Sequence, residues 1–106
     1  VVDMSLETQK ELISDYDVVL ERCFMQPLKN GQWISNAERN LKAIRKLGAE
    51  NSILSTGCGN PATPPWEESM RQYLQFMVDH NVSMEELRTM TKTTPTRLLG
   101  LADTLE

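Results

Sequence analysis

Residues 51–65, NSILSTGCGNPATPP, constrain the fold more than any other stretch of this chain. A short β-type run at 52–56 ends abruptly at the glycines and cysteine of 57–61, and a proline-rich loop then leads to an amphipathic helix that begins near Trp66. Small and polar residues therefore gather where a buried strand turns toward a helix. Ligands and catalytic groups of α/β proteins are usually found at such strand ends. The stretch thus predicts a candidate site at the end of this strand.

The first part of the chain predicts a helix followed by a strand. Ser5 is a suitable N-cap for a helix over residues 6–14. The continuous apolar run at 18–20 predicts a strand that is covered on both faces, as in parallel sheets. Neighbouring strand residues point to opposite faces. Of Glu21 and Arg22, we therefore expect one to face the open end of the sheet and the other to pack beneath a helix.

Turn and capping signals divide the rest of the chain. Pro27, Asn30 and Gly31 predict a loop over 26–33. A helix is predicted over 35–47, with a Ser35–Glu38 capping box at its start and Gly48 at its end, and another over 68–80. A second capping box, of Ser83 and Glu86, predicts a helix that follows Ser83. A last helix is predicted from Thr94 as N-cap, with Pro95 at the first helical position. Strands therefore alternate with helices, which favours parallel βα units. We predict one helix-rich α/β domain over residues 1–106.

The charge balance argues against nucleic-acid and anionic-membrane partners, because both require clustered Lys and Arg. The chain has 15 acidic and 11 basic residues, a formal net charge of −4. Lys42, Arg45 and Lys46 are typical of a solvated helix face. No apolar run approaches the roughly 20 residues that span a bilayer. Cys23 and Cys58 do not form a secreted disulfide framework, so we expect reduced thiols in a cytoplasmic protein.

Four segments carry a resemblance to a known family: SLETQKEL (5–12), VVLERCF (18–24), ILSTGCGNP (53–61) and MTKTTPTRLLGL (90–101). Together they resemble the C-terminal third of metal-dependent hydrolases of the amidohydrolase superfamily, in a poorly characterised branch. The resemblance implies the last strands and helices of a (β/α)₈ barrel. Strand 18–24 would be the seventh, strand 52–56 the eighth, and residues 1–3 the end of the sixth. It also implies a family cofactor, one or two divalent metals such as zinc, which activate a water for hydrolysis.

The chain departs from the family pattern at two positions. Gly57 stands where the family has the eighth-strand aspartate, so no carboxylate is present there to bind metal or accept a proton. Arg22 stands where some relatives carry a histidine, and a cation there would repel a metal. The first-strand His-x-His pair lies outside this chain, and the single histidine, His80, is placed at a helix end. We therefore assign no catalytic or cofactor-binding residue and expect no cofactor in this chain.

The candidate site loop consists of residues at or after the two strand ends: Glu21, Cys23, Gly57, Cys58 and Asn60. Whether they bind a metal stays open. Asp3, Glu21, Cys23 and Cys58 form a conceivable zinc set, but their spacing matches no compact zinc motif.

Two functions follow. The first is a relative of a metal-dependent hydrolase that is not catalytically competent as this chain alone. The second is a non-catalytic helical α/β oligomerisation or interaction module. One third of a barrel leaves open sheet edges and apolar helix faces, which invite association. We therefore predict a homo-oligomer.

Overall fold

The computed structural model describes residues 4–101. The elements follow in the order α1 (Leu6–Tyr16), β1 (Leu20–Cys23), β2 (Met25–Pro27), β3 (Trp33–Ser35), α2 (Ala37–Leu47), η1 (Ala49–Asn51), β4 (Ser52–Ser55), α3 (Trp66–Asp79), α4 (Met84–Arg88), η2 (Thr89–Thr93) and α5 (Thr94–Leu98). The α/β class is confirmed. The origin as a barrel fragment stays a prediction. Residues 1–3, predicted as the end of the sixth barrel strand and including Asp3 of the conceivable zinc set, lie outside the described residues.

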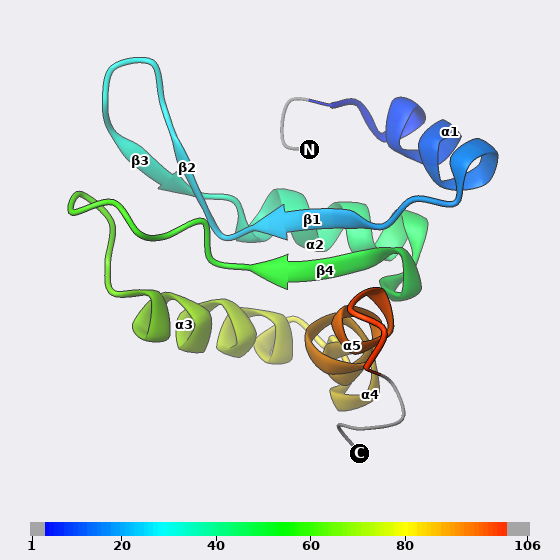
Figure 1. Cartoon of the computed structure of the whole chain (residues 1–106). Helices are drawn as coiled ribbons and strands as arrows, with labels where there is room; N and C mark the ends of the chain where they lie inside the picture. The colour runs from blue at the N-terminus through cyan, green and yellow to red at the C-terminus, as the bar shows by residue number, and fades with distance from the viewer. Residues whose placement is uncertain (1–3, 102–106) are drawn as a thin grey trace.

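The centre of the fold is a parallel pair of strands. β1 and β4 pair in parallel, with Leu20 opposite Ser52 and Cys23 opposite Ser55, so the predicted parallel βα arrangement is confirmed. Figure 1 shows the two strands side by side, with α3 beyond β4 and a β-hairpin projecting past the end of β1. Because directly paired residues share a face, Leu20, Arg22, Ser52 and Leu54 lie together on the buried face of this sheet.

The predicted loop over 26–33 is wrong at both ends. β2 and β3 form an antiparallel hairpin in which Met25 pairs with Ser35 and Pro27 with Trp33. The turn itself is shorter than predicted, and Leu28 N–H donates to Gln32 O across it (2.6 Å). Pro27 does not prevent the pairing, because a hairpin edge position needs no N–H donor.

Of the predicted helix caps at Ser5, Ser35 and Ser83, two are confirmed and one is wrong. Ser5 caps α1, and Ser83 with Glu86 forms the complete capping box of α4. The Ser35–Glu38 box is wrong, because Ser35 is held in β3 opposite Met25, and α2 starts at Ala37. α1 also runs two residues further than predicted and ends where Asp17 adopts the left-handed conformation (φ 51°).

The predicted last helix is present as α5, which begins at Thr94 with Pro95 in its first turn, but the prediction that Thr94 is its N-cap is wrong. Thr94 has helical dihedrals, and α4, η2 and α5 follow one another without a break. η2 is a π turn in which Thr94 N–H donates to Thr89 O. Pro95 has no N–H, and its ring would clash with the carbonyl four residues earlier in a regular α-helix. A widened turn accommodates the proline within one continuous helix.

The apolar core joins the parallel strands to α2, η1, α3, α4 and η2. Its buried members are Phe24, Ala37, Ile44, Ala49, Leu54, Tyr73, Met77, Val82, Leu87 and Met90. Phe24 and Tyr73 stack with their ring centroids 5.0 Å apart, which ties α3 to the end of β1. No helix within residues 4–101 is long and apolar enough to cross a membrane.

Candidate anion-binding site

The structure brings together only part of the predicted site loop. Cys23 ends β1 beside Ser55 of β4, whose hydroxyl donates to Cys23 Sγ (3.2 Å). Gly57 lies directly against this pair, because a Cβ atom added to it would be 3.1 Å from Cys23 Cβ and 2.7 Å from Met25 O. Gly57 also has φ +67°, a conformation that side chains disfavour. The close packing and the positive φ therefore disfavour an aspartate side chain at this position.

The other three predicted residues lie apart from one another. Glu21 is exposed on the opposite face of β1 from Arg22. Cys58 contacts α3, with Sγ 3.2 Å from Ser69 Oγ. Asn60 is exposed and forms a local turn, in which its Oδ1 accepts from Ala62 N–H (2.9 Å). Among residues 4–101, no three His, Cys, Asp or Glu side chains are grouped to hold a metal.

Arg22 is the most unusual side chain of the sheet. It is fully buried, with 1% of its surface exposed, on the same strand face as Leu20. The prediction that one of Glu21 and Arg22 packs beneath a helix is therefore confirmed, and Arg22 is that residue. Burying a charged group is costly unless it is paired and hydrogen-bonded. Each donor of Arg22 must therefore be accounted for.

Neutral side chains satisfy only part of the Arg22 guanidinium. Nε donates to Ser52 Oγ (2.7 Å), and Nη1 donates to Gln9 Oε1 (2.9 Å). Gln9 is in turn held by its Nε2, which donates to Met4 O (2.9 Å). Nη2 is buried and has no hydrogen-bond partner among residues 4–101. Within the described residues, no carboxylate pairs with Arg22.

Three further hydrogen bonds hold the backbone at Arg22 and Cys23. Tyr73 OH donates to Arg22 O (3.0 Å), and Asn40 Nδ2 donates both to Tyr73 OH (2.7 Å) and to Cys23 O (2.9 Å). Burial raises the pKa of the Tyr73 hydroxyl well above its usual range. Burial also lowers the pKa of the Arg22 guanidinium from its usual value. An arginine nevertheless remains protonated at neutral pH, so Arg22 brings a positive charge into the interior.

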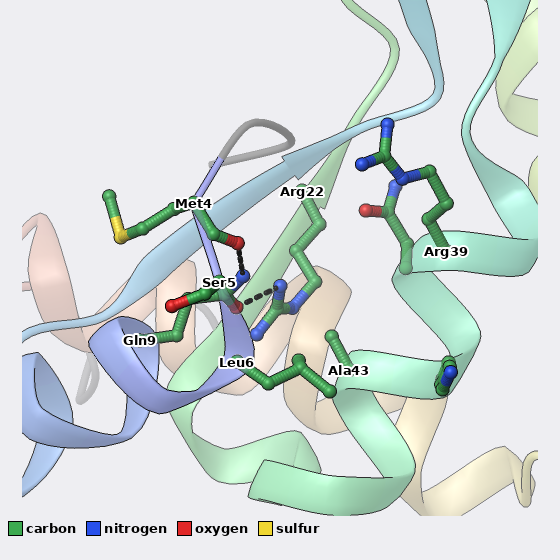
Figure 2. Close-up of a pocket in the computed structure, with 9 residues that line it drawn as sticks. Met4, Ser5, Leu6, Gln9, Arg22, Arg39 and Ala43 are labelled. Atoms are coloured by element: carbon green, nitrogen blue, oxygen red, sulfur yellow. Dashed lines mark hydrogen bonds between the residues drawn. The ribbon is translucent and has the colours of Figure 1, made fainter.

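A pocket of about 280 Å³ lies beside Arg22, between α1 and α2. Figure 2 shows Arg22 pointing toward the first turn of α1, where Ser5, Leu6 and Gln9 lie. We call this space the Arg22 pocket. It is lined by residues 4–6 and Gln9 on one side, by Arg22, and by Arg39, Asn40, Lys42 and Ala43 of α2 on the other.

All charged residues in the described lining of the Arg22 pocket are positive. Arg22, Arg39 and Lys42 are its charged members, and the described lining includes no carboxylate, imidazole or thiol. Ser5 and Leu6 contribute the start of α1, where backbone N–H groups and the helix dipole favour anions. The pocket therefore offers positive charge and hydrogen-bond donors, but no general base or nucleophile. Asn36 is also buried with both side-chain polar atoms unpaired, but it does not line this pocket.

Sequence reasoning missed this site although one signal was present. Arg22 follows the apolar run 18–20 closely, and it lies two residues from the buried Leu20. The alternation of a strand therefore places it on the covered face. Lys42 is exposed, as the pattern of a solvated helix face predicts, yet it borders the pocket.

No protein family, curated protein or solved structure matches this chain. The resemblance to amidohydrolases therefore stays a prediction from the four sequence segments.

Proposed function

We propose that this domain binds a small anion in the Arg22 pocket and does not itself catalyse a reaction. The observation that carries the proposal is Arg22, whose buried Nη2 has no partner among the described residues and whose side chain lines a pocket with two further cations and, within residues 4–101, no carboxylate. Leaving a buried charged donor unsatisfied costs several kcal/mol. An anion that reaches Nη2 would remove this cost, which supports binding at this position.

The proposal is compatible with the predicted hydrolase ancestry, which remains a proposal of its own. The strand-end residues 53–61 support that ancestry, and Gly57 supports loss of catalysis. We expect no stoichiometric divalent metal in the purified protein. Elemental analysis tests this expectation, and one equivalent of zinc per chain would direct attention back to Cys23 and Cys58.

Isothermal titration calorimetry with inorganic phosphate tests anion binding. We expect Arg22→Met to weaken binding about 10- to 100-fold, because a hydrogen bond to a charged group is worth about 1.5–3 kcal/mol. Arg39→Ser and Lys42→Ser should each weaken it about two- to fivefold, as exposed charges contribute roughly 0.2–1 kcal/mol. Both residues are exposed, so these variants should fold.

Lys46→Ser is the matched control for charge. Lys46 is exposed on α2 and does not line the Arg22 pocket. Its removal should therefore leave phosphate affinity unchanged. Equal weakening by Lys42→Ser and Lys46→Ser would show that phosphate responds only to overall charge, and the proposed site would be wrong.

A further inference from the structure

The charge of the Arg22 pocket favours a doubly charged ligand. Arg22, Arg39 and Lys42 together bring three positive charges, and Arg39 and Lys42 are neighbours on the α2 surface because they are three residues apart. The first turn of α1 adds a partial positive charge of about half a unit. Coulomb attraction doubles when the ligand charge doubles. A dianion therefore gains more from this lining than a monoanion such as a carboxylate.

The size of the pocket limits the ligand to a small molecule. Its volume of about 280 Å³ lies near the lower end of the roughly 300–1,000 Å³ of ligand pockets. Met4, Leu6 and Ala43 supply apolar wall beside the charged residues. An oxyanion beside Arg22 would be attracted by all three cations, and a short organic group would lie against this wall.

We propose that the ligand is a small phosphate monoester, bound as its dianion. This inference rests on the proposed function and names the ligand class for the same pocket. A phosphate group carries three strong acceptor oxygens, which suit donors that come from three separate places. These places are Arg22 on β1, the Arg39–Lys42 face of α2 and the first turn of α1.

The same chemical group also occurs on phosphorylated proteins. Arg22 lines the pocket, and its unpaired Nη2 is buried beneath the surface. A free small molecule reaches such a donor without desolvating a polypeptide. The small molecule is therefore favoured over a phosphopeptide, which becomes an outcome of the test.

Calorimetry on the full chain with glycerol phosphate, sulfate and acetate tests the inference. The second pKa of a phosphate monoester is about 6, so its dianion fraction rises about tenfold from pH 5 to pH 7. We expect glycerol phosphate to bind about tenfold more tightly at pH 7 than at pH 5. Sulfate is a dianion at both pH values and should change little. Acetate should bind at least tenfold more weakly than glycerol phosphate at pH 7.

Sulfate binding also controls for any change in the charge of the protein between pH 5 and pH 7. The charged residues of the described lining are Arg22, Arg39 and Lys42, and sulfate meets the same residues at both pH values. Glu7, exposed in the first turn of α1, would affect sulfate as well. Lys42→Gln should reduce the preference for glycerol phosphate over acetate, whereas Lys46→Gln should leave it unchanged.

Each other outcome has a definite meaning. If no anion binds, the proposed function itself is wrong. If acetate binds as tightly as glycerol phosphate, or glycerol phosphate shows no pH dependence, the anion site stands and the phosphate inference is wrong. A phosphoserine peptide that binds more than tenfold more tightly than glycerol phosphate would also overturn it and assign the pocket to a protein partner.

Discussion

Arg22 is positioned by residues that lie far from it in the sequence. Ser52 holds its Nε, Gln9 holds its Nη1, and Tyr73 binds its backbone carbonyl. These three come from β4, α1 and α3, so the guanidinium is oriented only when the whole domain is folded. A binding group that is fixed in advance loses little conformational entropy when its ligand arrives.

Gly57→Ala tests the close packing at the strand ends. The added methyl would lie 2.7 Å from Met25 O, and the residue would keep a positive φ. Gly31→Ala is the matched control, because Gly31 also has a positive φ (+86°) but no atom within 4 Å of an added Cβ. We expect Gly31→Ala to cost about 1–2 kcal/mol of unfolding free energy. Gly57→Ala should cost about 1–3 kcal/mol more because of the clash. Equal costs in urea denaturation would contradict this account.

Tyr73→Phe tests the buried hydroxyl. The variant loses the bond to Arg22 O and should lower the unfolding free energy by about 1–3 kcal/mol at pH 7. Burial raises the pKa of Tyr73 in the folded protein, so its contribution to stability is complete below the unfolded value of about 10 and falls as pH rises further. The wild type should therefore lose stability more steeply than Tyr73→Phe above pH 10.

Tyr16→Phe provides the control for the alkaline comparison. Tyr16 is 71% exposed, so its removal should change stability by less than about 0.5 kcal/mol. Denaturation at pH 8 and pH 11 measures both variants. The account of Tyr73 fails if Tyr16→Phe and Tyr73→Phe show the same pH dependence.

At the scale of elements, the periodic spacing of apolar residues predicted the helices and strands that bury one face. The helices near 6–14, 35–47 and 68–80 and the strand at 52–56 were predicted within a few residues, because each buries one regular face. The hairpin of β2 and β3 was not predicted, since its stability comes from pairing between strands. The π turn was missed because Thr94–Pro95 is a local start signal that the packing of the continuous helix overrides.

The candidate site was harder to predict, because it depends on contacts between elements and not on a local sequence pattern. Cys23 and Gly57 meet because parallel strands end at one edge, and that proximity follows from the alternation of strands and helices. The Arg22 pocket depends instead on where α1 lies against α2. Residues 4–9 carry no pattern that specifies this arrangement.

Ser83→Ala tests the capping box of α4. Ser83 Oγ accepts from Glu86 N–H (3.0 Å), and Glu86 Oε1 accepts from Ser83 N–H (3.0 Å). Removing the hydroxyl should cost about 1 kcal/mol of unfolding free energy. Ser14→Ala is the control, because Ser14 is exposed within α1 and should cost less than about 0.5 kcal/mol. A loss no greater than that of Ser14→Ala would show that the box adds nothing to stability.

At the scale of the molecule, one apolar groove remains exposed. It lies between α3 and α4, with a volume of about 680 Å³, and Leu74, Val78, Met84 and Leu87 form its apolar part. The homo-oligomer predicted from the sequence stays a prediction. Exposed apolar surface of this kind favours association.

Light scattering over a range of concentrations tests self-association. We expect a dimeric or larger mass in the wild type and a shift toward monomer in Met84→Glu, because a charge would be placed in the groove. Leu99→Glu is the matched control, since Met84 and Leu99 are equally exposed (72%) and Leu99 does not line the groove. A monomer at every concentration would contradict the prediction.

The most direct test of the central claim is an NMR titration of the ¹⁵N-labelled protein with glycerol phosphate. A small anion in the Arg22 pocket should shift the signals of residues 4–9, of Arg22 including its Nε–H, and of residues 39–43. Signals of residues 83–92 should remain unchanged. Saturable shifts confined to the first set would confirm the site, whereas no shifts, or shifts centred on another surface, would contradict it.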